Sequence, residues 1–285
     1  MLRTIKVILI MLVVLALALG VAGCGGQQTK DTKDSKQTSA QAGGGQQPAG
    51  KQKILVASDT TYAPFEFQDP NTGKYVGFDM ELIQAIAEVN NWDYEIRSMN
   101  FDGIVPALQS ASVDLAISAI TITEKRKEQV NFSLPYYQSG QCVAVKASNN
   151  TIKGFDDLAG KKIGVQIATT GADEARKIPG AKITDYNTIN EAFMALKNSN
   201  VDAVVNDYPV TFYFIQQGNK DVKIVGDLRT SEFYGIAVPK SKPDILEKVN
   251  SALKTLKENG KYAEIYKKWF DKEPPDFLPG EPPAN

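Results

Sequence analysis

The chain contains no histidine among its 285 residues. Histidine is the commonest side chain for proton transfer and metal binding near neutral pH. Its absence excludes Ser-His-Asp and Cys-His catalysis and every zinc site that uses a histidine ligand. The sequence also lacks a glycine-rich phosphate loop, a dinucleotide fingerprint and a calcium-loop spacing. We therefore expect no metal and no cofactor, while chemistry by carboxylates or lysine remains open.

Cysteine, excess basic charge and long apolar runs are equally scarce. The two cysteines are Cys24 and Cys142, and Cys142 lies in an apolar segment where we expect a buried small hydrophobe, not a nucleophile. A net charge of -1 without a basic stripe argues against nucleic acid as a partner. Beyond the first 22 residues no apolar run reaches the length of a membrane span, so we expect the remainder not to cross a membrane.

The N-terminus has the pattern of a targeting segment. Arg3 and Lys6 precede an apolar run over residues 7–22, which ends in Val21-Ala22-Gly23-Cys24. This pattern resembles a bacterial lipoprotein signal, in which the cysteine is lipidated. We therefore predict a signal peptide over residues 1–23 and a lipid on Cys24, with a plain secretory signal as the alternative.

Residues 25–52 are rich in Gly, Gln, Lys, Ser, Thr and Ala and have no apolar periodicity. Such a segment cannot bury enough surface to offset its chain entropy. We expect a flexible tether over residues 24–52 that holds a globular part near a membrane surface.

Residues 53–285 alternate short apolar segments with helical patterns. Strands are expected at residues 54–57, 94–96, 115–117, 142–145, 163–165 and 201–205. Helices are expected at residues 79–90, at residues 189–197 and from Tyr208-Pro209 onward, where proline suits the first turn. The alternation predicts an α/β fold with mostly parallel sheets, and its repetition predicts two lobes.

Small or polar residues follow four of the expected strands, namely Ser58-Asp59, Ser118-Ala119, Gln166 and Asn206-Asp207. In open α/β sheets, ligands bind outside the carboxyl ends of the strands. The sequence therefore predicts that these residues border a ligand site.

Residues 118–126, Ser-Ala-Ile-Thr-Ile-Thr-Glu-Lys-Arg, have the features of a receptor for a small carboxylate. Thr123 suits the N-cap of a short helix that holds Arg126 in its first turn. The planar guanidinium of Arg126 matches a carboxylate in two hydrogen bonds. An ordinary capped turn before a solvated helix is the alternative.

Several motifs, taken together and in order, resemble those of the polar amino acid-binding proteins of bacterial ABC importers, which have the two-lobed type II periplasmic-binding-protein fold. They are residues 59–67 (DTTYAPFEF), 77–79 (GFD), 101–108 (FDGIVPAL), 120–126, 132–137 (FSLPYY) and 265–270 (IYKKWF). The resemblance implies a first lobe from residues 53–138 plus 235–271 and a second lobe from residues 139–234. Two hinge strands near residues 137–139 and 232–234 would join them, and a Pro-rich tail would follow at 272–285.

The resemblance also implies a set of ligand-binding residues. The ligand carboxylate would be bound by Arg126, Thr121, the backbone at Ala119 and Thr170. The ammonium would be bound by Asp207, with the side chain or carbonyl of Ser118 nearby. The side-chain pocket would be formed by Asp59, Tyr62, Phe101, Gln166 and Asn206. Alternatively, the two aromatic residues belong to the core, and Asp207 is a helix N-cap, alone or in addition to binding ligand. The chain departs from many relatives at Ala119, where Ser or Gly is common, and at Ala168, where Gly is common.

The expected ligand follows from the charges. Asp59 beside two aromatic walls and the neutral Gln166 favours a cationic side chain, which makes arginine or lysine the leading prediction. Glutamine is the alternative, and histidine remains open. A remote alternative is an enzyme like the cyclohexadienyl dehydratases of the same fold. Such an enzyme needs a general acid, and the only acids expected in the cleft, Asp59 and Asp207, suit a cationic amino acid better.

The resemblance further implies the partners. They are a free amino acid, two permease subunits of an ABC importer and a cytosolic ATPase. We expect a monomer that is anchored by its lipid outside the cytoplasm, on the cytoplasmic membrane or, in a host that has one, on the outer membrane.

Overall fold

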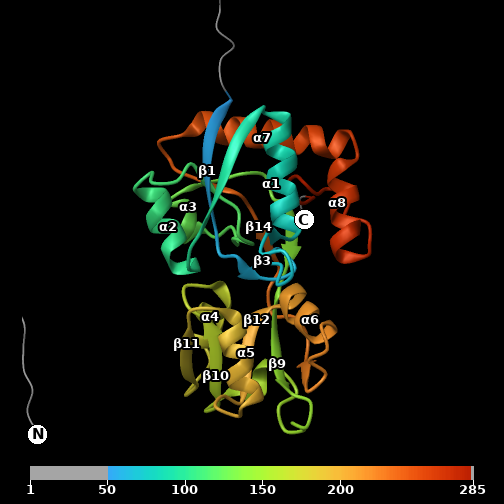
Figure 1. Cartoon of the computed structure of the whole chain (residues 1–285). Coiled ribbons are helices and arrows are strands. Elements are labelled where there is room, and N and C mark those ends of the chain that lie inside the picture. The colour runs from blue at the N-terminus through green and yellow to red at the C-terminus, as the bar shows by residue number, and fades with distance from the viewer. Residues whose placement is uncertain (1–50, 284–285) are drawn as a thin grey trace, which may run out of the picture. The chain divides into compact units, whose positions relative to one another are not determined.

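The computed structural model describes residues 51–283. The expected signal peptide, Cys24 and nearly all of the tether lie outside these residues. Residues from Ala49 to Asn285 form one compact unit. Within it the strands make two five-stranded sheets, and each sheet with its helices is called a lobe below (Figure 1).

The first lobe is built on the sheet β5-β1-β6-β15-β7. Its strands are β1 (Gln52–Ser58), β5 (Trp92–Ser98), β6 (Leu115–Ala116), β7 (Asn131–Phe132) and β15 (Ala237–Val238). Its helices are α1 (Phe78–Val89), α2 (Phe101–Gln109), α3 (Glu124–Lys127), α7 (Pro243–Glu258) and α8 (Lys261–Phe270). A small sheet of β2 (Thr61–Tyr62), β3 (Glu66–Gln68) and β4 (Tyr75–Val76) adjoins them.

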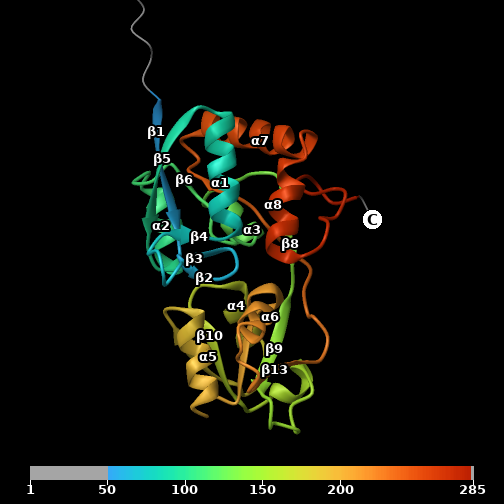
Figure 2. The same cartoon turned by 45° about the vertical axis from the view of Figure 1, so that its right-hand side comes forward.

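The second lobe is built on the sheet β11-β10-β12-β9-β13. Its strands are β9 (Gln141–Lys146), β10 (Lys162–Gln166), β11 (Lys182–Tyr186), β12 (Ala203–Asp207) and β13 (Val222–Val225). Its helices are α4 (Thr170–Arg176), α5 (Ile189–Lys197) and α6 (Tyr208–Gln216), with a 3-10 turn at Phe155–Leu158. In both views of the molecule, α4, α5 and α6 lie beside this sheet (Figures 1 and 2).

The expectation of mostly parallel sheets holds for strand direction, because four of the five strands in each sheet run the same way and one, β15 or β9, is reversed. Strands β5, β1 and β6 are parallel, as are β11, β10 and β12. In contrast, β15 runs antiparallel to β6 and β7, and β9 runs antiparallel to β12 and β13. The reason is connectivity, because β9 and β15 are the strands that first enter each lobe from the segment between the lobes.

That segment consists of β8 (Tyr137–Ser139) and β14 (Glu232–Tyr234), which pair antiparallel. They coincide with the two hinge strands that the family resemblance implies. The chain passes between the two sheets at these strands (Figure 2).

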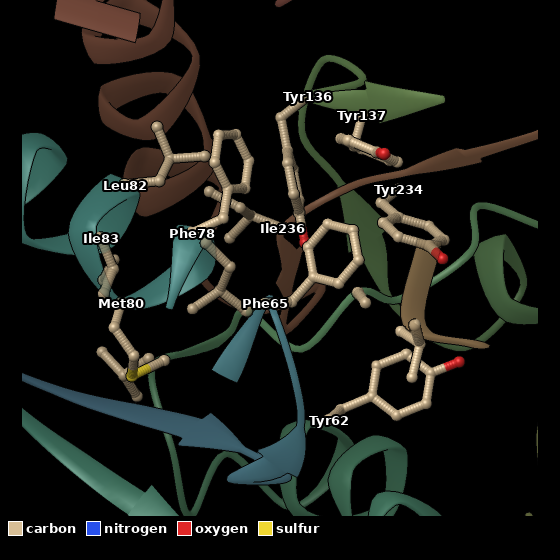
Figure 3. Close-up of a cluster of buried hydrophobic side chains, with 14 of the residues drawn as sticks. Tyr62, Phe65, Phe78, Met80, Leu82, Ile83, Tyr136, Tyr137, Tyr234 and Ile236 are labelled. Carbon is tan, nitrogen blue, oxygen red and sulfur yellow. The ribbon is translucent and has the colours of Figure 1, made fainter. Parts of the chain in front are cut away.

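Aromatic packing fixes the hinge against the first lobe. The ring of Phe65 lies 4.9 Å from that of Tyr137 and 5.3 Å from that of Tyr234, both nearly edge-on (Figure 3). Such pairs add about 0.5–1.5 kcal/mol each beyond the burial of apolar area. The residues next to Phe65 in sequence are thereby held at the junction of the lobes.

The expected helices form with local signals that explain them. The α5 helix begins with a capping box in which Thr188 and Glu191 exchange side-chain hydrogen bonds with each other's backbone. The α1 helix buries Leu82, Ile83 and Ile86, as its periodicity predicts. Val89, which was expected on the same face, is 42% exposed because it ends the helix.

Residues 272–283, expected to be an extended tail, instead pack onto the protein. Leu278 is buried, and the ring of Phe277 lies edge-on at 6.1 Å from Phe233 of β14. The amide of Gly280 donates to the carbonyl of Pro135, at 2.9 Å. The segment therefore belongs to the folded unit, because its two apolar side chains have a place against the hinge.

Among the described residues, no helix combines the length and the apolar character that crossing a membrane requires.

Candidate functional site

A cavity between the lobes collects the residues that the sequence placed at the strand ends. Its volume open to the centre of a water molecule is about 10 Å³, which is room for about one water. Its lining is Asp59, Tyr62, Glu66, Phe101, Ser118, Ala119, Thr121, Arg126, Gln166, Thr169, Thr170 and Asp207. The structure thus brings ten of the eleven predicted ligand-binding residues together and adds Glu66 and Thr169. Asn206 lies behind this lining, where its Oδ1 accepts a hydrogen bond from the Tyr62 hydroxyl at 2.9 Å.

Arg126 is positioned by a short helix whose cap the sequence predicted. Thr123 accepts a hydrogen bond from the Arg126 amide at 3.2 Å, which confirms it as the N-cap of α3. The guanidinium donates to the carbonyls of Thr121 (2.8 Å) and Ala168 (3.0 Å) and lies 5.2 Å from the ring centre of Phe101. Burial lowers the pKa of Arg126, but a guanidinium remains charged in proteins. Among the described residues, no carboxylate lies within 4.0 Å of it.

The structure separates the two possible roles of Ser118. Its hydroxyl donates to Glu66 Oε1 and accepts from the Asp59 amide, both at 2.9 Å. The hydroxyl proton is therefore used within the protein, and the carbonyl is the group of Ser118 that remains for a ligand. The amide of Ala119, which the resemblance assigns to a ligand carboxylate, donates instead to Asp79 Oδ2 at 2.9 Å.

Glu66 and Asp79 form a buried carboxyl pair behind this part of the cavity, with no exposed surface on either residue. Burial raises the pKa of Asp79 to about 6, and it raises the pKa of Glu66 well above the ordinary value. Glu66 Oε2 and Asp79 Oδ1 have no donor as a partner among the described residues. The interaction between the two carboxyls raises the pKa of Glu66 and lowers that of Asp79. The raised pKa of Glu66 favours its protonated form, so the proton of the pair belongs on Glu66 before Asp79.

Asp59 lines the cavity and is 3% exposed. It accepts hydrogen bonds from the Thr61 hydroxyl (2.7 Å) and from Gln166 Nε2 (2.6 Å). Within residues 51–283 it has no lysine or arginine within 4.0 Å. Burial, the largest effect, raises its pKa. Its charge is thus met by neutral donors alone.

The two expected aromatic walls differ in their surroundings. Tyr62 is 6% exposed and belongs to the main hydrophobic cluster as well as to the cavity lining, so the two readings of this residue are compatible. Phe101 begins α2 and is half-buried, with the guanidinium of Arg126 over its ring.

Asp207 ends β12 and occupies the N-cap position of α6, but its side chain makes no capping hydrogen bond. Its carboxyl instead accepts from the Tyr234 hydroxyl and from Gln141 Nε2. Burial, followed by the charge of Glu232, raises its pKa to about 7. The side chain is therefore directed to the cavity, and the N-cap alternative is wrong for it.

The expectation that Asp59 and Asp207 are the only acids in the cleft is wrong. Glu66 lines the cavity, and Glu232 of β14 accepts from the hydroxyls of Thr121 (2.9 Å) and Thr170 (2.8 Å). Glu66 lies inside the motif at residues 59–67, so its position gave a signal. Glu232 had no comparable signal, because it follows the second lobe in sequence and approaches the cavity only through the pairing of β14 with β8.

Besides a 3.4 Å contact between the hydroxyls of Thr121 and Thr170, four hydrogen bonds join the lobes directly around the cavity. They link Asp59 to Gln166, Tyr62 to Asn206, Arg126 to the Ala168 carbonyl, and the Thr61 carbonyl to Asn190 Nδ2 (3.0 Å). An amino acid is larger than the cavity, so its entry requires these bonds to break.

The arrangement places one cation and separate anions around a small polar space. Arg126 donates two of its five N–H groups to carbonyls and has others for a carboxylate. Asp207 offers a carboxyl for an ammonium, and Asp59 is a second acid in the lining, which also includes Tyr62 and Phe101. The chemistry of this lining fits a zwitterion with a polar side chain.

Comparison with known proteins agrees with this geometry. Residues 54–272 match the model of the bacterial extracellular solute-binding proteins, family 3, and the chain belongs to this family. It is 34% identical over 217 residues to a probable histidine-binding protein of Campylobacter jejuni, covering 76% of this chain and 84% of the relative. It is 30% identical over 229 residues to the arginine-binding extracellular protein ArtP of Bacillus subtilis, covering 79% and 89%.

Solved structures show the same fold. An ancestral arginine-binding protein bound to arginine superposes with a TM-score of 0.75 at 45% identity, covering 78% of this chain and all of that one. The arginine-, lysine-, histidine-binding protein ArtJ of Geobacillus stearothermophilus gives a TM-score of 0.74 at 41% identity, covering 78% and 97%. The expected two-lobed type II periplasmic-binding-protein fold is thereby confirmed.

Proposed function

We propose that this protein captures a free amino acid outside the cytoplasm and delivers it to the permease subunits of an ABC importer, which a cytosolic ATPase drives. Its family consists of extracellular solute-binding proteins, and the relatives named above bind histidine or arginine. Arg126 would bind the α-carboxylate and Asp207 the α-ammonium. Anchoring by a lipid on Cys24 and action as a monomer are parts of this proposal.

The preferred ligand in this proposal is arginine or lysine. The observation that carries it is Asp59, a buried carboxylate whose described neighbours include hydrogen-bond donors but no cation. A buried charge without a counter-charge is unfavourable, and a cationic side chain would supply that counter-charge. Tyr62 and Phe101 line the same cavity, and aromatic rings attract a guanidinium or ammonium group.

Glutamine is the second candidate, and one contact favours it. The amide of Gln166 already donates to Asp59 at 2.6 Å, so a ligand amide could take the same place. A related ancestral arginine-binding protein, 45% identical to this chain, has also been solved bound to glutamine.

Binding without chemical conversion is the remaining part of the proposal. Glu66 and Asp79 interact with each other, and the other acids of the cleft are used on donors or on the proposed ammonium. Turnover of prephenate by the purified protein would contradict this part, and would favour the dehydratase-like alternative.

The proposal is tested by measuring ligand affinity directly. The full chain, unfolded to remove bound ligand and refolded, is screened against the twenty amino acids by thermal shift, since a ligand that binds the native state raises its stability. Calorimetry should then rank arginine or lysine above glutamine. Asp59→Asn should lower the affinity for the cationic ligand by at least about tenfold and leave the affinity for glutamine nearly unchanged, because the variant loses only the charge that pairs with a cation.

Gln166→Lys is the matched second variant, since it leaves Asp59 in place and adds a positive charge beside it. Like Asp59→Asn, it should lower the affinity for the cationic ligand. If glutamine displaces arginine from the wild type at equal or lower concentration, the preference for a cationic side chain is wrong. If none of the twenty amino acids binds, the proposed function itself fails.

A further inference from the structure

Glu232 is a second acid beside Asp207, since both contact the side-chain amide of Gln141. It lies on the hinge and not on either lobe. It opens β14, where it pairs with Ser139 of β8, and is 8% exposed. Its Oε2 accepts from the hydroxyl of Thr121, in the first lobe, and from that of Thr170, in the second. Its Oε1 accepts from the Thr230 hydroxyl at 2.9 Å. One carboxylate therefore contacts both lobes and the hinge.

The direction of these bonds determines what the two hydroxyls can offer a ligand. A hydroxyl has one proton, and a carboxylate can accept but not donate. Because Thr121 and Thr170 both donate to Glu232, only lone pairs remain on their oxygens. One lone pair of Thr170 already accepts from Gln141 Nε2 at 3.2 Å, which leaves one for a ligand. Those oxygens are acceptors, which suits an ammonium and not a carboxylate.

The surrounding charges lead to the same conclusion. Gln141 Nε2 donates to Asp207 and lies 3.3 Å from both oxygens of Glu232, so the two acids flank one amide. Within the described part of the chain, neither acid has a lysine or arginine within 4.0 Å. An α-ammonium placed beside them would supply the missing positive charge.

We propose that Glu232 is a positioning residue for the α-ammonium of the ligand: it holds the hydroxyls of Thr121 and Thr170 as acceptors and adds a second negative charge beside Asp207. This inference rests on the proposed binding of an amino acid. It differs from the assignment that the family resemblance implies, in which Thr121 and Thr170 bind the carboxylate. Arg126 then carries carboxylate recognition.

The test pairs each protein variant with a ligand that lacks the ammonium. Arginine and its desamino analogue 5-guanidinopentanoate share the carboxylate and the guanidinium, so they differ in the ammonium alone. Calorimetric affinities are measured for the full chain, for Glu232→Gln and for Asp227→Asn, an exposed acid in the second lobe that serves as the charge control. Glutamine and 4-carbamoylbutanoate form the equivalent pair if glutamine ranks first.

Glu232→Gln should weaken arginine by at least about tenfold and its desamino analogue by less than about threefold, since truncating one member of a buried charge arrangement weakens the ligand that uses it. Asp227→Asn should change neither. Equal losses for both ligands in Glu232→Gln would overturn the inference and leave Glu232 a merely structural residue. Failure of the wild type to bind any amino acid would instead count against the proposed function.

Thr170→Val is the second variant and decides the matter if Glu232→Gln does not fold. Thr170 is half-buried at the start of α4, where valine has nearly the same volume. If its hydroxyl serves the ammonium, arginine should lose more affinity than the desamino analogue. If it serves the carboxylate, both ligands should lose the same factor, and the inference is wrong.

Discussion

At the scale of single residues, the cleft has an ionisable group poised at neutral pH although the chain has no histidine. Asp207 has a pKa of about 7 because it is buried and lies near the charge of Glu232, while the Tyr234, Gln141 and Tyr62 side chains act in the opposite direction. An ordinary aspartate, with a pKa of 3.8, would be fully ionised at that pH. The proton on Asp207 therefore competes with the ammonium of a ligand.

This competition predicts how affinity depends on pH. A ligand ammonium favours the ionised carboxyl, so binding below pH 7 must first release the proton. Affinity should fall by about tenfold per pH unit as the pH drops below about 7, with up to one proton released per ligand. Calorimetry in buffers of different ionisation enthalpy measures that number. Asp227→Asn should release as many protons as the wild type, and a flat affinity between pH 5 and 8 would contradict the prediction.

The stability of the protein without ligand depends on pH in the opposite direction to the affinity: it falls as the pH rises. The folded protein binds the Asp207 proton more tightly than the unfolded chain does, because its pKa is raised from 3.8 to about 7. The resulting contribution to stability is fully present below pH 3.8, the pKa of the group in the unfolded chain, and is lost as the pH rises through about 7, its pKa in the folded protein. A bound ligand, which supplies a counter-charge, should offset this loss.

The residues that sequence reasoning placed correctly are those that follow buried strands. Asp59, Ser118, Gln166 and Asp207 could be placed because a strand end has a fixed position in an α/β sheet. The use of each polar atom could not be derived this way. The Ala119 amide and the Ser118 hydroxyl are taken up by Asp79 and Glu66, which approach from other elements.

Ala168 occupies a backbone conformation that favours glycine, which the sequence alone does not show. Its φ of 63° lies in the left-handed region, where glycine is unstrained and alanine costs about 1 kcal/mol. Its carbonyl accepts from Arg126, so the loop conformation is part of the contact between the lobes. The glycine that the family resemblance implies at this position would suit the same conformation.

At the scale of elements, the helices were easier to predict than the sheets. Periodicity placed α1 and α5 within one or two residues, because it is a local signal. The antiparallel strands β9 and β15 were not predicted, since their direction depends on how the chain leaves the hinge. The packing of residues 272–283 was missed for a different reason: the proline-rich composition hides one buried side chain, Leu278, and one partly buried side chain, Phe277.

The buried tail predicts a measurable stability. Leu278 is 2% exposed, so Leu278→Ala should lower the free energy of unfolding by about 2–5 kcal/mol through lost burial and a cavity. Leu228, 49% exposed, provides the matched control, and Leu228→Ala should change the free energy by no more than about 0.5 kcal/mol. Urea unfolding measures both. A loss of less than about 1 kcal/mol for Leu278→Ala would show that the tail does not contribute to the fold.

At the scale of the whole molecule, the two-lobed plan and both hinge strands followed from the family motifs, and the fold is confirmed. The limits of the lobes and the anchor remain predictions. Cys24 lies outside the described residues, and the argument for its lipid is the sequence pattern before it.

The anchor is tested in a bacterial host. Cys24→Ser should move the protein from the membrane fraction to the soluble extracytoplasmic fraction, because the lipid attachment site is gone. Cys142→Ser is the control for loss of a thiol, and it should stay with the membrane, since Cys142 is buried in β9. Continued membrane association of Cys24→Ser would contradict the assignment.

The four hydrogen bonds that join the lobes also have a kinetic consequence. A ligand cannot reach Arg126 or Asp207 until those bonds break, so separation of the lobes precedes capture. At high ligand concentration the observed association rate should then stop rising and equal the rate of lobe separation. Residence time and capture rate would accordingly depend on contacts such as Thr61 with Asn190, which lie outside the cavity lining.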